Sequence, residues 1–157
     1  MDPEAILQAL AEHEVEYVLV GGLAATARGA SLVTFDVDLC FRQDRANCER
    51  LAAALAALGA QIYPYRTEPM AITAEILAAH RIINAGMPAG RLDLLAEVPG
   101  LGRYEDFVAE TATLTLGSIS VLALTVDQLI QAKSALSRPK DREHLDQLLA
   151  LKKLRDP

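Results

Sequence analysis

Two aspartates separated by one residue are the side chains of this chain with the clearest chemical potential. Asp36 and Asp38 lie in a segment that alternates strictly between apolar and polar residues from Val33 to Phe41. Successive side chains of a strand point to opposite faces, so both carboxylates share one face, with Cα atoms roughly 6.6 Å apart. Such a pair can bind one or two divalent cations, and Mg²⁺ would offset the repulsion between the charges. A polar strand face turned to water explains the same alternation.

A glycine pair stands thirteen residues before these aspartates. Gly21 and Gly22 follow the apolar run 17–20, which is typical of a strand buried on both faces, and precede an alanine-rich helix expected over 23–28. Glycines allow the backbone to approach a ligand, and the first N–H groups of a helix can bind an anion. An ordinary turn is the competing interpretation. The pair fits neither a P-loop nor a dinucleotide-binding motif.

A third carboxylate lies in a second predicted strand, over 91–95. Alternation separates Asp93 from Leu92 and Leu94, which predicts that it points away from the core. It can then either complete a site with the two earlier aspartates or form a surface ion pair with Arg91 or Arg81.

Capping residues and hydrophobic spacing predict the elements that position these carboxylates. Helices are expected to begin at Asp2-Pro3, at Asp44 and at the capping box of Thr125 and Gln128. Three further helices are expected, over 73–79, 103–110 and 140–154, the last burying Leu145, Leu148 and Leu149. Two hairpins are expected, from 81–84 with 91–95 across a turn at 86–90, and from 113–116 with 119–122.

These elements predict an α/β (α+β) fold. Its small, mixed, largely antiparallel sheet is flanked by helices, and a helical pair from about residue 125 packs on it. The hairpins require antiparallel pairing, which disfavours a doubly wound parallel sheet. In the segment 33–41 the apolar face, which includes Val33 and Phe35, is expected in the core.

Length and charge restrict the kind of protein. The 157 residues are 52% hydrophobic, with 15 basic and 21 acidic side chains and a net charge of −6. One soluble domain over 1–157 is expected, because a chain of this length can bury a core without disulfides or metals. Cys40 and Cys48 indicate free thiols in a cytoplasmic protein, and we find neither a signal peptide nor a membrane span. The acidic balance argues against non-specific binding to DNA.

The glycine and aspartate pairs together are more specific than either alone. Val20-Gly21-Gly22, the spacer and Asp36-Val37-Asp38-Leu39 resemble the signature of the nucleotidyltransferase superfamily with the DNA polymerase β-like fold. The segments 17–39, 90–95 and 124–133 with 138–141 are similar to small prokaryotic nucleotidyltransferase-like proteins related to abortive-infection (AbiE type) toxins. Related sequences often have a basic or small polar residue where this chain has Phe35, which we expect to leave the metal site intact.

The resemblance implies roles for named residues. Asp36 and Asp38 would bind Mg²⁺, or Mn²⁺ in its place, together with a nucleoside triphosphate (NTP) such as ATP. Asp93 would complete the metal site and activate an acceptor hydroxyl, and Gly21 and Gly22 would hold phosphates through backbone N–H groups.

Two lysines are further candidates for nucleotide binding by the same resemblance. Lys133 would face the cleft and contact phosphates, and Lys140 would extend a basic rim. A lysine whose stem is buried while its ammonium reaches water is the alternative for Lys133, and a solvated helix start is the alternative for Lys140. His13, His80 and His144 lack the spacing of a zinc site.

The resulting hypothesis is a Mg²⁺-dependent nucleotidyltransferase that moves a nucleoside monophosphate from an NTP to the hydroxyl of an RNA such as a tRNA, a protein or a small molecule. A toxin role with an antitoxin partner is implied by resemblance alone. The alternative is a binding module that keeps the fold without turnover.

Overall fold

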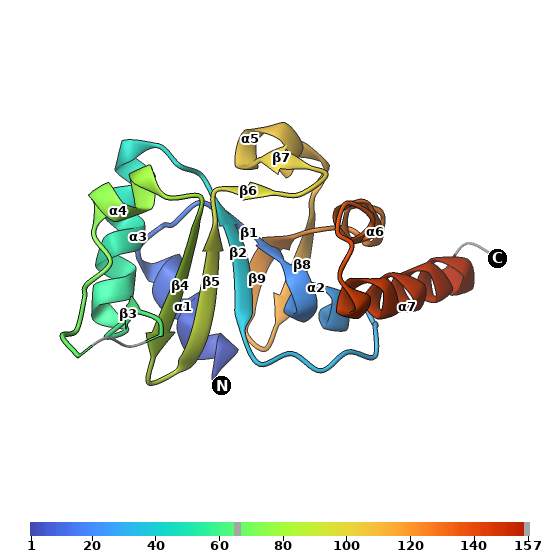
Figure 1. The fold of residues 1–157 in the computed structure, drawn as a ribbon, viewed down its shortest axis with the longest axis horizontal. Coiled ribbons are helices and arrows are strands. Elements are labelled where there is room, and N and C mark those ends of the chain that lie inside the picture. Colours follow the sequence, from blue (N-terminus) through green and yellow to red (C-terminus); the bar gives the residue numbers. More distant parts are fainter. Residues whose placement is uncertain (65–66, 156–157) are drawn as a thin grey trace.

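A seven-stranded sheet forms the centre of the structure (Figure 1). The computed structural model describes residues 1–64 and 67–155. The strands of this sheet are β1 (Tyr17–Val20), β2 (Val37–Phe41), β3 (Gln61–Ile62), β4 (Ile82–Met87), β5 (Gly90–Leu95), β8 (Ala112–Leu116) and β9 (Ile119–Ala123). Their order is β3-β4-β5-β2-β1-β9-β8. A separate small hairpin pairs β6 (Glu97–Val98) with β7 (Gly102–Arg103).

The helices form two groups beside the sheet. The first group, at the left of Figure 1, consists of α1 (Pro3–Glu12), α3 (Arg45–Ala57) and α4 (Ala74–Ala79). The second group, at the right, consists of α2 (Gly21–Ala27), α6 (Val126–Ser134) and α7 (Pro139–Arg155). The short α5 (Tyr104–Phe107) continues into a 3-10 turn, Val108–Glu110, beside the β6–β7 hairpin. In the described part of the chain, every helix is too short or too polar to cross a membrane.

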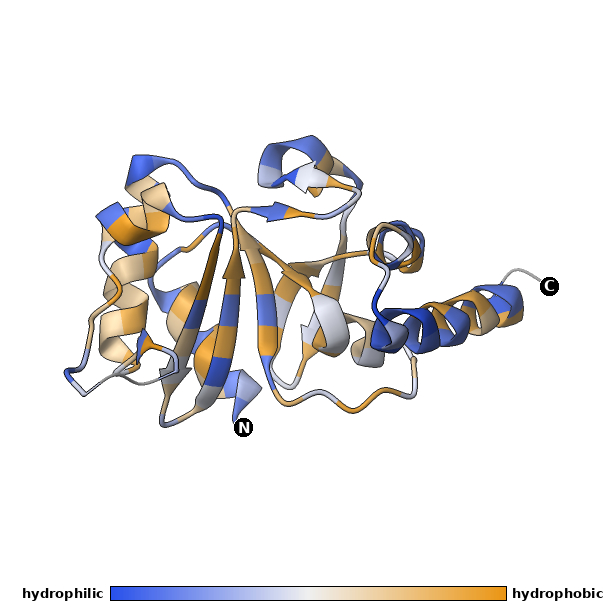
Figure 2. Ribbon diagram, in the orientation of Figure 1, coloured by the Kyte–Doolittle hydropathy of each residue, from blue (hydrophilic) through white to orange (hydrophobic). Residues whose placement is uncertain are grey.

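The predicted fold class is confirmed. Four of the strand pairs in the large sheet are antiparallel, while β1 with β9 and β2 with β5 are parallel. Local capping chemistry defines the helix starts as expected: Asp2 accepts a hydrogen bond from the N–H of Ala5, Asp44 does so from Asn47, and Thr125 pairs with Gln128. Hydrophobic residues dominate the central strands, with isolated hydrophilic positions on β2 and β5 (Figure 2).

The strand predicted over 33–41 is wrong in its first half. β2 begins at Val37, and Val33 and Phe35 are 73% and 71% exposed instead of buried. The physical reason is the shortness of β1, whose last residue, Val20, already pairs with Asp38. Residues 33–36 therefore have no partner on the β1 side, although their sequence alternates and β5 extends to Gly90 on the other side.

Three other expectations need correction. The β4–β5 hairpin is longer than predicted and turns at Pro88 and Ala89 alone, since Met87 pairs with Gly90. Leu149 on α7 is 39% exposed, and the buried face of that helix carries Asp141, His144 and Leu148 instead. The two glycines of the sequence motif form the first turn of α2 instead of preceding it.

A buried asparagine joins three elements on the side of the sheet away from α7. The Asn47 side chain, which is 0% exposed, accepts a hydrogen bond from the Glu16 N–H at 2.7 Å. Its amide group donates to the carbonyls of Glu16 and Arg42 at 2.9 and 2.7 Å. Asn47 thus links α3 to the start of β1 and the end of β2, the strand that carries Asp38.

We expect Asn47→Ala to lower the free energy of unfolding by about 3 kcal/mol, because it leaves buried backbone groups without partners. Urea denaturation followed by circular dichroism measures this change. Asn84→Ala, the same substitution at an exposed position of β4, is the matched control and should cost far less. Equal losses in the two variants would show that the Asn47 hydrogen bonds do not carry the stability.

Candidate active site

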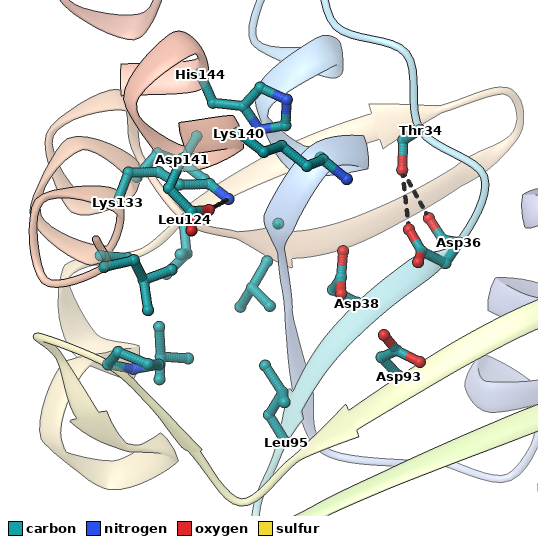
Figure 3. Close-up of a pocket in the computed structure, with 18 of the residues that line it drawn as sticks. Thr34, Asp36, Asp38, Asp93, Leu95, Leu124, Lys133, Lys140, Asp141 and His144 are labelled. Carbon is teal, nitrogen blue, oxygen red and sulfur yellow. Dashed lines mark hydrogen bonds and ion pairs between the residues drawn. The ribbon is translucent and has the colours of Figure 1, made fainter. Parts of the chain in front are cut away.

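A cavity of about 750 Å³ lies on the side of the sheet that faces α2, α6 and α7. Asp36, Asp38 and Asp93 line one wall of it, together with Gly21 and Gly22. Figure 3 shows the three carboxylates side by side along the neighbouring strands β2 and β5. The structure therefore brings together the five residues of the glycine and carboxylate motifs.

Strand register places two of the carboxylates next to each other. In the parallel β2–β5 pair, Asp38 lies opposite Asp93. Asp36 precedes β2 and is held by Thr34, whose hydroxyl donates to its carboxylate at 3.2 Å and to its carbonyl at 3.0 Å (Figure 3). Residues 33–36 thus lie outside the sheet, but the carboxylate of Asp36 still lines the cavity.

Gly21 is required by its contact with Asp38. Its φ of +65° favours glycine, and a Cβ atom there would lie 2.1 Å from Oδ2 of Asp38. The N–H of Gly22 donates a hydrogen bond to the Asp38 carboxylate. In this structure the glycine pair therefore packs against the carboxylate of Asp38.

Burial and neighbouring carboxylates raise the pKa of two of these aspartates, Asp38 and Asp93. Burial, followed by the charges of Asp36 and Asp93, raises the pKa of Asp38 to about 6. Burial and the charge of Asp36 also raise the pKa of Asp93, against an opposing effect of Arg91. Negative charge is thus costly at this wall unless a cation compensates it.

The surface ion pair considered for Asp93 does not form among the described residues. Arg81 pairs with Glu97, and the guanidinium of Arg91 lies 5.4 Å from the ring centre of Tyr63. Both arginines are thus engaged elsewhere, and the carboxylate of Asp93 lines the cavity.

The opposite wall of the cavity is basic. Lys133, from α6, lines it with a side chain only 16% exposed, and its Nζ lies 2.9 Å from Oδ1 of Asp141 on α7. Arg138 binds the other oxygen of Asp141 at 2.6 Å. The charges of Lys133 and Arg138 interact with Asp38 across the cavity. Lys133 is therefore neither wholly surrounded by water nor free to rotate.

Asp141 is a site residue that the sequence did not reveal. Its side chain is 1% exposed; burial opposes its ionisation, but hydrogen bonds from Arg138 and Lys133 outweigh this and lower its pKa. The alternating charges of 138–143 suggested a solvated helix start, which does not hold for the buried Asp141. The available signal was the spacing of Asp141, His144 and Leu148 at three and four residues, which places them on one helical face.

Lys140 and His144 complete the basic wall. Both line the cavity, and Lys140 extends from α7 toward the side occupied by the aspartates (Figure 3). His144 is 9% exposed, a burial that its isolated position in the sequence did not predict. Cys40 is 0% exposed and is absent from the cavity lining among the described residues, in agreement with a small buried thiol.

The carboxylate wall suits a metal ion that arrives with phosphate. Within 1–64 and 67–155, no three acidic, histidine or cysteine side chains form a cluster able to hold an ion alone. Mg²⁺ is commonly bound by one or two carboxylates together with substrate phosphates, so Asp36 and Asp38 fit this mode. The raised pKa of Asp38 shows that its ionised form is unfavourable without a cation. Such a cation would remove this cost.

Solved structures share this fold at low sequence identity. The lincosamide antibiotic adenylyltransferase LnuA, solved with lincomycin, aligns with a TM-score of 0.62 and 14% identity over 95% of each chain. The antibiotic-resistance factor ANT(2'')-Ia, in complex with adenylyl-2''-tobramycin, aligns with a TM-score of 0.58 and 18% identity over 98% of this chain and 92% of that one. A Thermotoga maritima protein assigned as a nucleotidyltransferase gives 0.58 and 14% identity, over 94% and 90%. No protein-family model and no curated protein sequence matches the chain.

The raised pKa of Asp38 predicts a pH-dependent cost in stability. Since the folded-state pKa of about 6 lies above the ordinary 3.8, the folded protein binds the proton more tightly, and stability falls as pH rises from about 4 to 6. We expect Asp38→Asn to be more stable than the wild type by about 3 kcal/mol at pH 8 and little different at pH 4. Thermal unfolding at the two pH values measures this.

The exposed Asp146→Asn on α7 removes one surface charge and controls for the change in net charge. Adding Mg²⁺ at pH 8 should reduce the difference in stability between Asp38→Asn and the wild type, because the ion should stabilise only the protein that keeps Asp38. A difference in stability between Asp38→Asn and the wild type that is the same at pH 4 and pH 8 would contradict the role assigned to Asp38.

Proposed function

We propose that this protein transfers a nucleoside monophosphate from an NTP to an acceptor hydroxyl, releasing pyrophosphate. The observation that carries the proposal is the cavity with three carboxylates on one wall and Lys133 with Lys140 on the other. The cationic groups of such a cavity can bind a polyanion. Its acidic groups then lie near the phosphate that reacts. The nucleotidyltransferase folds that the chain resembles support the same reaction.

The donor side of the cavity would use the residues of the sequence motif. Asp36 and Asp38 would hold Mg²⁺, or Mn²⁺ in its place. When bound, the metal would neutralise phosphate charge and polarise the phosphorus that is attacked. Gly21 and Gly22, which line the same wall, would bring backbone N–H groups to the phosphates, for which the Gly22 N–H would exchange its hydrogen bond to Asp38. Adenylyl groups are named for two of the similar proteins, so ATP is the first donor to test.

Asp93 would act on the acceptor. Its carboxylate lines the cavity beside Asp38, and its raised pKa makes it a stronger base than an exposed aspartate. The acceptor hydroxyl would give its proton to Asp93 as its oxygen bonds to the α-phosphorus. The bond from that phosphorus to the bridging oxygen would break, and pyrophosphate would leave with the electron pair.

The wall beyond Asp93 favours a small molecule as the acceptor. Ile82, Leu95, Val98 and Pro99 give this end of the cavity an apolar surface, and Ile82 is 62% exposed. Arg81, the base at this end, is paired with Glu97, so the phosphates of an RNA would find little positive charge there. Two of the similar proteins were solved with adenylyl-2''-tobramycin and with lincomycin. RNA and protein acceptors are the other outcomes of the experiment below.

We expect isothermal titration to detect Mg²⁺-dependent binding of at least one NTP to the wild type, and none to the double variant Asp36→Ala with Asp38→Ala. Asp93→Asn should still bind the nucleotide but should transfer it at least about a hundredfold more slowly, the usual cost of losing a general base. Transfer is measured with α-labelled NTPs and a cell extract, and fractionation of the labelled product identifies the acceptor as RNA, protein or small molecule.

The exposed Asp146→Asn is the control for both measurements and should behave as the wild type. Nucleotide binding without any labelled product would favour the binding module over the enzyme. Absence of Mg²⁺-dependent nucleotide binding in the wild type would refute the enzyme.

A further inference from the structure

One side chain of the basic wall has no part in the reaction proposed above. His144 is more than nine-tenths buried on α7, yet it lines the cavity opposite the carboxylates (Figure 3). It occupies the face of α7 that also carries Leu148, where an apolar residue would pack without cost. An imidazole at this position therefore calls for a chemical explanation.

The Nδ1 atom of His144 has no hydrogen-bond partner among the described residues, although it is buried. Buried polar atoms in folded proteins are nearly always paired, so an unpaired one in a residue that lines a cavity calls for an explanation, and a ligand of that cavity is one that can be tested. Lys140 stands one helical turn before His144 on the same helix, and both line the same cavity. The available partner is thus one that the cavity admits.

The charges that face the ring identify the chemistry of that partner. They are Lys133 on α6 and Lys140, Asp141 and Glu143 on α7. Burial, followed by the charges of Lys133 and Lys140, lowers the pKa of His144, so the free ring is neutral near pH 7. Asp141 already binds Lys133 and Arg138, which leaves the wall with a surplus of positive charge. Its complement is an anion with several oxygen atoms.

We propose that His144 binds the β- and γ-phosphates of the donor nucleotide together with Lys133 and Lys140, and that it takes up a proton from solvent as they bind. The inference rests on the proposed function. The α-phosphate must lie near Asp93 for transfer, so the rest of the triphosphate extends toward the basic wall. An anionic ligand offsets the charges of Lys133 and Lys140, which together with burial lower the pKa of the free ring, and no bond of the nucleotide is broken in this step.

The test is calorimetry of the full chain with Mg²⁺ and the α,β-methylene analogue of the best-bound NTP, which cannot be transferred. Titrations at pH 7.5 in two buffers with different heats of ionisation give the number of protons taken up. We expect greater proton uptake by the wild type than by His144→Gln, and an affinity about tenfold weaker in His144→Gln. The corresponding nucleoside monophosphate, which lacks the β- and γ-phosphates, should bind both proteins equally.

The pH dependence has a defined sign. Because nucleotide binding raises the pKa of His144, the contribution of His144 to affinity is greatest at low pH and is lost as pH rises through the pKa of the bound state. Titration of the γ-phosphate is common to both proteins, so only the difference between wild type and His144→Gln reports on the ring. His80→Gln, at an exposed position outside the cavity lining, should keep the wild-type proton uptake.

Nuclear magnetic resonance of ¹⁵N-histidine in the wild type gives a result that does not depend on how His144→Gln folds. The His144 ring should shift from the neutral to the protonated form on adding the analogue with Mg²⁺. A ring that stays neutral, or equal proton uptake in wild type and His144→Gln, would overturn the inference while leaving the proposed function intact. A wild type that binds no NTP would instead refute the proposed function.

Discussion

Mutual repulsion among three carboxylates is the constraint around which the site is built. The parallel β2–β5 register places Asp38 beside Asp93, and Thr34 holds Asp36 next to them. Partial burial of Asp38, followed by the charges of Asp36 and Asp93, raises its pKa to about 6. The contact of Gly21 with the Asp38 carboxylate leaves no room for a side chain, which keeps the wall rigid. A wall of this kind favours binding of cations, and the strands cannot relieve it by moving apart.

The opposite wall is organised by a buried negative charge. Asp141 is 1% exposed and binds both Lys133 and Arg138. Removing one partner of a buried pair leaves an uncompensated charge, which is strongly destabilising. The lysine is therefore held in place before any ligand arrives, and less side-chain entropy is lost when a phosphate binds. The cavity thus places fixed charges of both signs across from each other, as binding of a metal with a triphosphate requires.

The parts of the molecule that depend on local chemistry could be predicted from the sequence. Caps such as Asp44 and Thr125, the buried run of β1 and the alternation around Asp93 are properties of neighbouring residues. The exposure of Phe35 could not be predicted, because it follows from where β1 ends and not from the segment that contains Phe35. Likewise, the parallel β2–β5 pairing joins segments far apart in the chain. The buried role of Asp141 depends on the packing of α7 against α6, which local charge alternation concealed.

The net charge of the chain and the charges that line the cavity lead to different expectations about phosphate binding. A net charge of −6 disfavours non-specific contact with nucleic acid, which depends on many basic groups. Within the cavity, however, Lys133 and Lys140 face the aspartates, and a cation bound by Asp36 and Asp38 would reverse the sign of that wall as well. The acidic surface would then repel extended polyanions while the cavity accepts a compact one. The net charge of the chain would therefore disfavour extended polyanions. It would not oppose binding of a compact anion, such as a nucleotide, in the cavity.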